Sequence, residues 1–171
     1  GRSGRRLSGH SRAGPAGRDS STSCGMERIM ISNILSIAGS DPSGGAGIQA
    51  DIKAISANGG YAMAAITALT AQNTRGVSAV QMIEPAFVAE QIAALRADIR
   101  IDAVKIGMLG TSDMVSSVFA ALAGLDAPVV LDPVMVAKGG DRLLRADAVA
   151  ALRDALAQAS VITPNLPEAA D

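Results

Sequence analysis

The chain has 171 residues, of which 49% are hydrophobic and only 2% aromatic, and its formal net charge at pH 7 is −1. This length allows one sizeable core and at most one full domain. No apolar run reaches the roughly 18 residues that a membrane helix needs, so we expect a soluble, cytoplasmic protein without a membrane partner.

The only histidine, His10, and the only cysteine, Cys24, both lie within the first 25 residues. From Met26 onward the sequence therefore excludes catalytic triads that contain a histidine and zinc sites built from Cys and His. A single cysteine cannot form an internal disulfide, which is consistent with a reducing compartment. The polar groups that remain are carboxylates, lysines, hydroxyls, amides and glycine-rich backbone, which are the groups that phosphoryl-transfer enzymes use.

Residues 1–25 contain five arginines and one acid and are rich in Gly and Ser, which predicts a disordered arm outside the fold. This composition is also that of a transit peptide, but Met26 and Met30 lie just before the first expected strand, so we favour a non-native leader. Residues 26–171 hold ten basic and fifteen acidic side chains. Such an acidic domain does not favour nucleic acid as a partner.

Apolar runs and helical stretches alternate along residues 26–171. The expected strands are 34–38, 62–69, 103–108, 129–131 and 161–163. Two of the expected helices are 46–57 and 146–159. A third opens at Pro85 and carries an apolar stripe of Val88, Ile92, Leu95 and Ile99, and a fourth is capped by Thr111 or Ser112. This alternation predicts a three-layer α/β/α fold with a mainly parallel sheet, truncated at its C-terminus because the pattern breaks off at Asp171. Ligands of such sheets bind beyond the carboxyl ends of the strands.

The first polar cluster, residues 39–47, is a glycine-rich loop between an expected strand and an expected helix. Glycines let the backbone approach a ligand closely, and a helix N-terminus offers free N–H groups. The spacing is neither a dinucleotide fingerprint nor a Walker loop. Taken alone, the loop could equally be a tight turn without a ligand. Asp51 in the following helix could likewise be an ordinary solvated carboxylate.

Two further clusters follow the next two expected strands. Residues 70–74 are uncharged, and the amide of Gln72 both donates and accepts, which suits the edge of a heterocycle; a plain polar loop is the alternative. Lys105 lies in a strand expected to be buried on both faces, so it needs an ion-pair partner. Met108 suits either the core or the face of a flat ring.

The last two clusters carry oxygen atoms that suit a metal ion. Asp132 ends an apolar strand, where burial is costly unless a metal ion or a helix N-terminus satisfies the carboxylate. Lys138 lies in a glycine-containing loop that suits a lid. Asn165 suits a helix N-cap, and Glu168, three residues on, is within expected reach of a metal-bound water near Asp132.

Together these clusters resemble one family. The segment 38–51, Ala-Gly-Ser-Asp-Pro-Ser-Gly-Gly-Ala-Gly-Ile-Gln-Ala-Asp, is similar to the N-terminal signature of the hydroxymethylpyrimidine/phosphomethylpyrimidine kinases, which are ribokinase-like. The segments 67–74, 105–109, 131–135 and 162–168 follow in the family's order. The resemblance extends from about Ile31 to Asp171, and its Asn-x-x-Glu element, shared across the ribokinase superfamily, discriminates least.

The resemblance implies an ATP-dependent kinase of thiamine biosynthesis. In that family, the γ-phosphoryl group of ATP is transferred to the hydroxymethyl group of 4-amino-5-hydroxymethyl-2-methylpyrimidine, and a second one to the resulting monophosphate. The residues that the resemblance places around the pyrimidine are Gly39, Asp51, Gln72, Met108 and the backbone of Val134.

For ATP and the metal ion, the resemblance implies that Lys138, Asn165 and Glu168 bind phosphates and that Asp132 and Glu168 hold Mg²⁺ through water. It also implies that the full-length protein is a homodimer. The family's later Gly-Thr-Gly-Cys segment, which supplies an anion pocket and the residue proposed to activate the hydroxyl, does not occur in these 171 residues. We therefore identify no catalytic residue and expect this chain alone to be inactive.

Two alternatives to this function remain open at the level of sequence. A pyridoxal kinase-like enzyme would share the fold and much of the chemistry. A non-catalytic pyrimidine-binding remnant would bind the ring without turning over ATP. The Gly-Gly-Ala-Gly and Ala-Gln-Asn-Thr segments favour the pyrimidine over pyridoxal.

Overall fold

A parallel sheet of five strands forms the centre of the computed structural model, which describes residues 30–135, 144 and 146–169. The sheet order is β2-β1-β5-β6-β7, and all four neighbouring pairs are parallel. Its strands are β1 (Asn33–Ala38), β2 (Tyr61–Ile66), β5 (Ala103–Ile106), β6 (Val129–Leu131) and β7 (Val161–Ile162). The predicted arm 1–25 and Lys138 lie outside the described residues.

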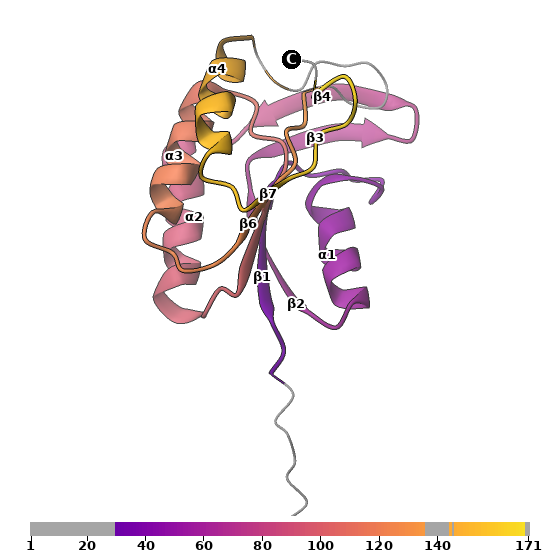
Figure 1. The fold of residues 1–171 in the computed structure, drawn as a ribbon. Helices are drawn as coiled ribbons and strands as arrows, with labels where there is room; N and C mark the ends of the chain where they lie inside the picture. Colours follow the sequence, from indigo (N-terminus) through magenta and orange to yellow (C-terminus); the bar gives the residue numbers. More distant parts are fainter. Residues whose placement is uncertain (1–29, 136–143, 145, 170–171) are drawn as a thin grey trace, which may run out of the picture.

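Helices cover both faces of this sheet (Figure 1). They are α1 (Gly47–Ala57), α2 (Pro85–Asp98), α3 (Ser112–Leu122) and α4 (Ala146–Leu156). Helix α1 lies on one face, and α2, α3 and α4 lie on the other. The expected α/β fold with a mainly parallel sheet is therefore confirmed. None of these helices, in the part of the chain that is described, has the length and apolarity to cross a membrane.

The main core lies between the sheet and helices α2 to α4. Alternate strand residues point into it because successive side chains of a strand face opposite sides. The fully buried members include Leu35, Ile37, Val104, Ile106 and Leu131 from the strands and Val88, Ile92, Met114 and Val118 from the helices. The other alternate residues of β1 and β5, which include Ser36 and Lys105, face α1 and the candidate site.

The helix ends follow the expected signals. Pro85 is the first residue of α2, and the Thr111 hydroxyl caps α3 by accepting a hydrogen bond from the Met114 N–H at 3.2 Å. At the end of α1, Asn58 is the C-cap, and Gly59 adopts a φ of 81°. This left-handed conformation favours glycine, which explains why the helix stops there.

The structure corrects one expectation about the sheet. Residues 62–69 are not a single strand, and 70–74 is not a loop: β3 (Ala68–Asn73) and β4 (Gly76–Met82) form a separate antiparallel hairpin. The buried Thr67 separates β2 from β3, because its hydroxyl donates to the Met108 carbonyl at 2.6 Å and its own carbonyl accepts from the Ile83 N–H at 2.9 Å. The hairpin extends over the carboxyl ends of the strands (Figure 1).

Candidate active site

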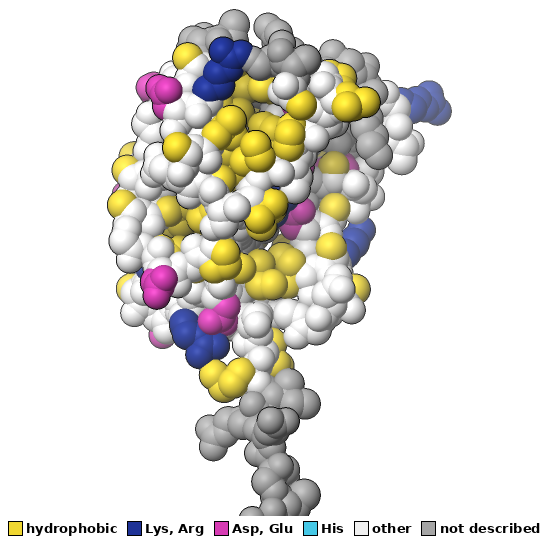
Figure 2. All heavy atoms as spheres, viewed as in Figure 1, with side chains coloured by type: hydrophobic (Ala, Val, Ile, Leu, Met, Phe, Trp, Pro, Cys, Tyr) yellow, Lys and Arg dark blue, Asp and Glu magenta, His cyan; other side chains and the backbone are white. Residues whose placement is uncertain are grey.

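A cleft of about 620 Å³ lies where the carboxyl ends of β1, β5 and β6 meet the β3–β4 hairpin. Figure 2 shows this face hollowed near its centre, with charged side chains at the bottom of the hollow. Eight of the nine predicted site residues line this one cleft, and the ninth, Lys138, lies outside the described residues. The eight are Gly39, Asp51, Gln72, Met108, Asp132, Val134, Asn165 and Glu168.

The glycine-rich loop 39–47 forms one wall of the cleft, and Gly47 closes it. Gly47 has a φ of 55°, and a Cβ atom there would lie 2.2 Å from the Gly39 carbonyl oxygen. The same oxygen accepts a hydrogen bond from the Ile48 N–H at 3.0 Å. At Gly39 itself, a Cβ would come within 3.2 Å of the Met108 sulfur. Gly47 therefore needs glycine for close approach of the backbone, whereas a Cβ at Gly39 would require the Met108 side chain to shift by a few tenths of an ångström.

Asp41 organises the interior of this loop. Its carboxylate accepts hydrogen bonds from the Ser43 N–H and hydroxyl at 2.9 and 2.7 Å, and from the N–H groups of Gly45 and Ala46 at 3.1 and 2.8 Å. Burial alone raises the pKa of Asp41, but these bonds, led by the Ser43 hydroxyl, lower the pKa by more, so that it lies below its ordinary value.

We expect Asp41→Asn to reduce the free energy of unfolding by about 1–3 kcal/mol at pH 7, because an amide NH₂ would face N–H donors. A lowered pKa in the folded state stabilises the fold above the ordinary pKa of 3.8 and ceases to do so as the pH falls through the folded value. The difference between wild type and variant should therefore shrink at pH 3. Urea unfolding at both pH values measures it.

The matched control is Asp98→Asn, which changes an exposed carboxylate of α2 and should stay within about 0.5 kcal/mol of wild type. An equal destabilisation by Asp41→Asn at pH 3 and pH 7 would contradict the role assigned to the ionised carboxylate.

The hairpin is attached to the same loop by reciprocal hydrogen bonds. The Thr70 N–H donates to the Ser40 hydroxyl at 3.0 Å, the Thr70 hydroxyl donates to the Ser40 carbonyl at 2.8 Å, and the Ser40 N–H donates to the Ala68 carbonyl at 2.8 Å. Gln72 follows a register shift in β3, and its amide oxygen lies 3.4 Å from the Thr70 hydroxyl. The hairpin thus holds the Gln72 amide at the cleft.

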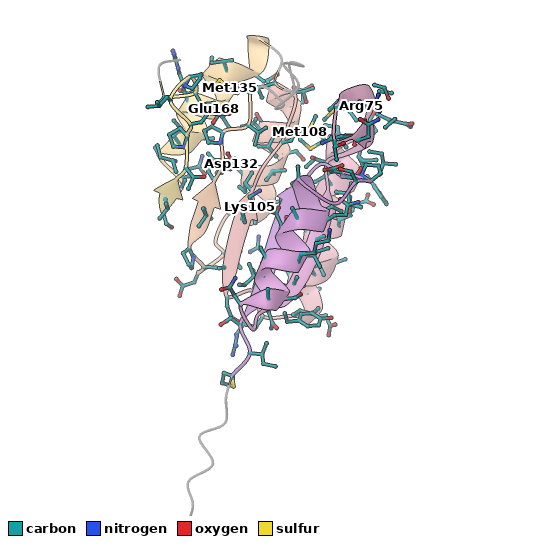
Figure 3. The ribbon with its side chains drawn as sticks, turned by 90° about the vertical axis from the view of Figure 1, so that its right-hand side faces the viewer. Arg75, Lys105, Met108, Asp132, Met135 and Glu168 are labelled. Atoms are coloured by element: carbon teal, nitrogen blue, oxygen red, sulfur yellow. The ribbon has the colours of Figure 1, made fainter. Side chains whose placement is uncertain are left out.

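Three polar side chains meet at the base of the cleft. Asp51 of α1 accepts a hydrogen bond from the Ser36 hydroxyl at 2.7 Å and pairs with the Lys105 ammonium at 3.1 Å. The ion pair that Lys105 was expected to need is therefore confirmed. Figure 3 shows that Lys105 and Asp132 lie between α1 on one side and strands β6 and β7 on the other.

At the other end of the cleft, Asn165 and Glu168 cap one another. The Asn165 side-chain oxygen accepts from the Glu168 N–H at 2.9 Å, and a Glu168 carboxylate oxygen accepts from the Asn165 N–H at 3.0 Å. The second carboxylate oxygen accepts from the Met135 N–H at 3.3 Å. This reciprocal pattern is that of a capping box, but the described residues 166–169 form a turn and not a helix, so the helix that Asn165 was expected to cap stays a prediction. The bonds hold the Glu168 carboxylate at the cleft.

Asp132 lines the same cleft and is close enough to feel the charges of Lys105 and Asp51 at the base and of Glu168 at the other end. Burial raises the pKa of the Asp132 carboxyl, the positive charge of Lys105 lowers it, and the negative charges of Glu168 and Asp51 raise it, with a net upward shift. A bound cation would favour the ionised form. Among the described residues, no three His, Cys, Asp or Glu side chains gather into a metal site, and at this end of the cleft they offer a cation the carboxylates of Asp132 and Glu168.

Sequence reasoning missed three residues that build this site. Ser36 could have been found from the sequence, because it is the single hydroxyl inside the apolar run 34–38 and a buried hydroxyl needs a hydrogen-bond partner. Asp41 and Ser40 lie in the glycine-rich loop that was recognised, but their hydrogen bonds depend on how the loop and the hairpin fold together.

Comparison with known proteins decides the family. The model of the phosphomethylpyrimidine kinase family matches residues 41–171, which is most of the chain. The chain belongs to the phosphomethylpyrimidine kinase family. It is 58% identical over 147 residues to the hydroxymethylpyrimidine/phosphomethylpyrimidine kinase of Escherichia coli, a match that covers 85% of this chain and 54% of that protein. The chain thus spans about half the length of this relative.

Solved structures of this kinase family and of pyridoxal kinases share the fold. The phosphomethylpyrimidine kinase of Clostridium difficile has a TM-score of 0.75 at 46% identity, over 81% of this chain and 61% of that one. Pyridoxal kinase of Bacillus subtilis, solved as an ADP complex, has a TM-score of 0.72 at 40% identity, over 82% of this chain and 54% of that one. These relatives are kinases, that is, phosphotransferases.

Proposed function

We propose that this chain carries the pyrimidine-binding part of a kinase of thiamine biosynthesis. The reaction is transfer of the γ-phosphoryl group of ATP to the hydroxymethyl group of 4-amino-5-hydroxymethyl-2-methylpyrimidine, and then to its monophosphate. The observation that carries the proposal is the meeting of the Gln72 amide, the Asp51 carboxylate and the Met108 thioether in one cleft of a chain from this family.

Each of these groups suits a small aminopyrimidine. The Gln72 amide both donates and accepts, so it can pair with two neighbouring positions on the edge of a ring. An ionised Asp51 only accepts, so it requires a donor such as the ring amino group. Met108 offers a polarisable surface to the face of a flat ring, and Gly39 leaves room for the approach. The backbone of Val134 borders the same space.

The residues at the other end suit ATP and Mg²⁺. Mg²⁺ keeps several waters and takes one or two carboxylates together with substrate phosphates, which matches a site that offers Asp132 and Glu168. Bound there, the ion would neutralise charge on the transferred phosphoryl group. Asn165 would contact phosphate, and Lys138 would add a positive charge.

We expect Glu168→Gln to weaken divalent-cation binding by about tenfold. The variant removes one of the two carboxylate charges near the ion, the other being that of Asp132, and Glu168 is expected to contact the ion mainly through water. Mn²⁺ can replace Mg²⁺ as a paramagnetic probe, and its broadening of the amide signals around Asp132 and Glu168 reports the affinity. Binding of the pyrimidine without nucleotide should change little. Glu90→Gln, an exposed carboxylate on α2, is the control.

The assignment of Glu168 would be wrong if Mn²⁺ affinity were unchanged while pyrimidine binding collapsed. That pattern would place Glu168 with the ring and leave the cation to other groups.

Pyridoxal is the rival substrate, because pyridoxal kinases are among the structural relatives. Equilibrium binding to the purified chain separates the two: we expect 4-amino-5-hydroxymethyl-2-methylpyrimidine to bind and a tenfold excess of pyridoxal to displace little of it. Preferential binding of pyridoxal would favour the rival. The homodimer implied by the resemblance and the cytoplasmic location expected from the sequence remain predictions, and sedimentation of the full-length protein tests the first.

A further inference from the structure

Ser36 and Lys105 occupy matching positions on neighbouring strands. In the parallel register of β1 and β5 they lie directly opposite one another, on the face of the sheet that α1 covers. Ser36 is completely buried, and it is one of few polar side chains in the described part of the chain with that degree of burial. The buried Ser36 hydroxyl needs a partner, and the Lys105 side chain is partly buried, with 26% exposed; α1 supplies Asp51 to both.

Both donors contact the same atom of Asp51. The Ser36 hydroxyl donates to Oδ2 at 2.7 Å, and the Lys105 ammonium lies 3.1 Å from that oxygen. The other carboxylate oxygen, Oδ1, accepts no hydrogen bond from any residue that the structure describes, although Asp51 lines the cleft. Two charge-assisted contacts to one oxygen fix the rotation of the carboxylate and leave the other oxygen available.

Gly107 provides the space for the ammonium. A Cβ atom at Gly107 would lie 3.0 Å from the Lys105 Nζ and 3.1 Å from the Ala38 Cβ, so a larger residue would crowd the ammonium against β1. Asp132 is the other carboxylate near Lys105, and Figure 3 shows both at the cleft. The 3.1 Å contact is nevertheless made to Asp51.

We propose that Ser36 and Lys105 are positioning residues that hold Oδ2 of Asp51 and so present Oδ1 to the cleft as a fixed acceptor for an amino group on the ligand ring. This inference rests on the proposed function. An ionised carboxylate has no proton to donate, so a ligand without a donor at that position would leave Oδ1 desolvated and unpaired. The three residues would therefore set the preference for an aminopyrimidine.

The test compares two ligands that differ only in the donor. These are 4-amino-5-hydroxymethyl-2-methylpyrimidine and its deamino analogue, 5-hydroxymethyl-2-methylpyrimidine, with affinities measured by calorimetry on the 171-residue chain. For wild type we expect the amino compound to bind about ten- to a hundredfold more tightly, the range of a hydrogen bond to a charged group. A structural defect alone would weaken the binding of both ligands together and leave the ratio of the two affinities unchanged.

Ser36→Ala and Lys105→Met should each reduce the ratio several-fold, and Lys105→Arg, which keeps the charge and the donors, should retain more of it than Lys105→Met. Ser36→Ala removes one oxygen atom and adds no volume, so it should fold even if Lys105→Met does not. Arg100→Met is the control, because Arg100 pairs with Asp102 at the opposite end of β5.

The outcomes separate this inference from the proposed function. If wild type bound neither compound, both would fail. If wild type bound the amino compound but Ser36→Ala and Lys105→Met kept the wild-type ratio, only the positioning role would be overturned. A wild type that bound both compounds equally well would also overturn it, and would leave the pyrimidine site itself in place.

Discussion

Gly47→Ala should lower the free energy of unfolding by about 2–4 kcal/mol. The left-handed backbone at Gly47 costs an L-residue about 1–2 kcal/mol, and the new methyl would lie 2.2 Å from the Gly39 carbonyl oxygen, which is backbone and cannot rotate away. For a chain of this size the change corresponds to a fall in the melting temperature of roughly 5–15 °C. Thermal unfolding followed by circular dichroism measures it.

Gly59→Ala is the matched control. Gly59 has a φ of 81°, but a Cβ there meets nothing within 4 Å, so the variant carries the cost of the backbone conformation without the clash. We expect it to lose about 1–2 kcal/mol. Equal losses in the two variants would mean that the loop 39–47 opens easily, and that the contact between Gly39 and Gly47 does not hold the wall of the cleft.

Gln72→Leu should raise the dissociation constant of 4-amino-5-hydroxymethyl-2-methylpyrimidine about ten- to a hundredfold. Leucine keeps a similar volume but has no amide, so the polar edge of a buried ring would lose its partner, at roughly 1–3 kcal/mol. The melting temperature should change little, because the amide is half-exposed and its hydrogen bond to the Thr70 hydroxyl is 3.4 Å long. Calorimetric titration measures the affinity.

Gln81→Leu makes the same chemical change on β4, at an exposed position opposite Leu69 that does not line the cleft. It should bind the pyrimidine as wild type does. If the two variants lost the same affinity, the effect would come from the hairpin as a whole, and the Gln72 amide would have no specific contact with the ring.

Local signals predicted the parallel part of the fold because they coincide with the tertiary structure. The apolar run at Ile34 to Ala38 is a buried strand, and the turn at Asn58 and Gly59 ends α1 because Gly59 adopts a left-handed conformation. The polar clusters were correctly expected to converge, since the carboxyl ends of parallel strands meet at one edge.

The hairpin was not predicted, because its strands have little local signal. Residues 70–74 are uncharged and mostly polar, so they resemble a loop, and most of β4 is exposed. Neither segment therefore shows the apolar alternation of a half-buried strand. What stabilises it is tertiary: the bonds between Thr70 and Ser40, and the bond from the Thr67 hydroxyl to the Met108 carbonyl, join segments about 30 to 40 residues apart in sequence. The hydrogen bond between Ser36 and Asp51 could not be predicted for the same reason, because it depends on how α1 packs against β1.

The central claim is that this chain binds an aminopyrimidine in the cleft beneath the hairpin, and mapping of amide chemical shifts tests it most directly. On titration of the ¹⁵N-labelled chain with 4-amino-5-hydroxymethyl-2-methylpyrimidine, we predict saturable shifts concentrated in the loop 39–47, around Gln72 and at Met108. Shifts that were absent, or that gathered at the opposite end of the sheet around Ile34 and Gly60, would contradict the claim.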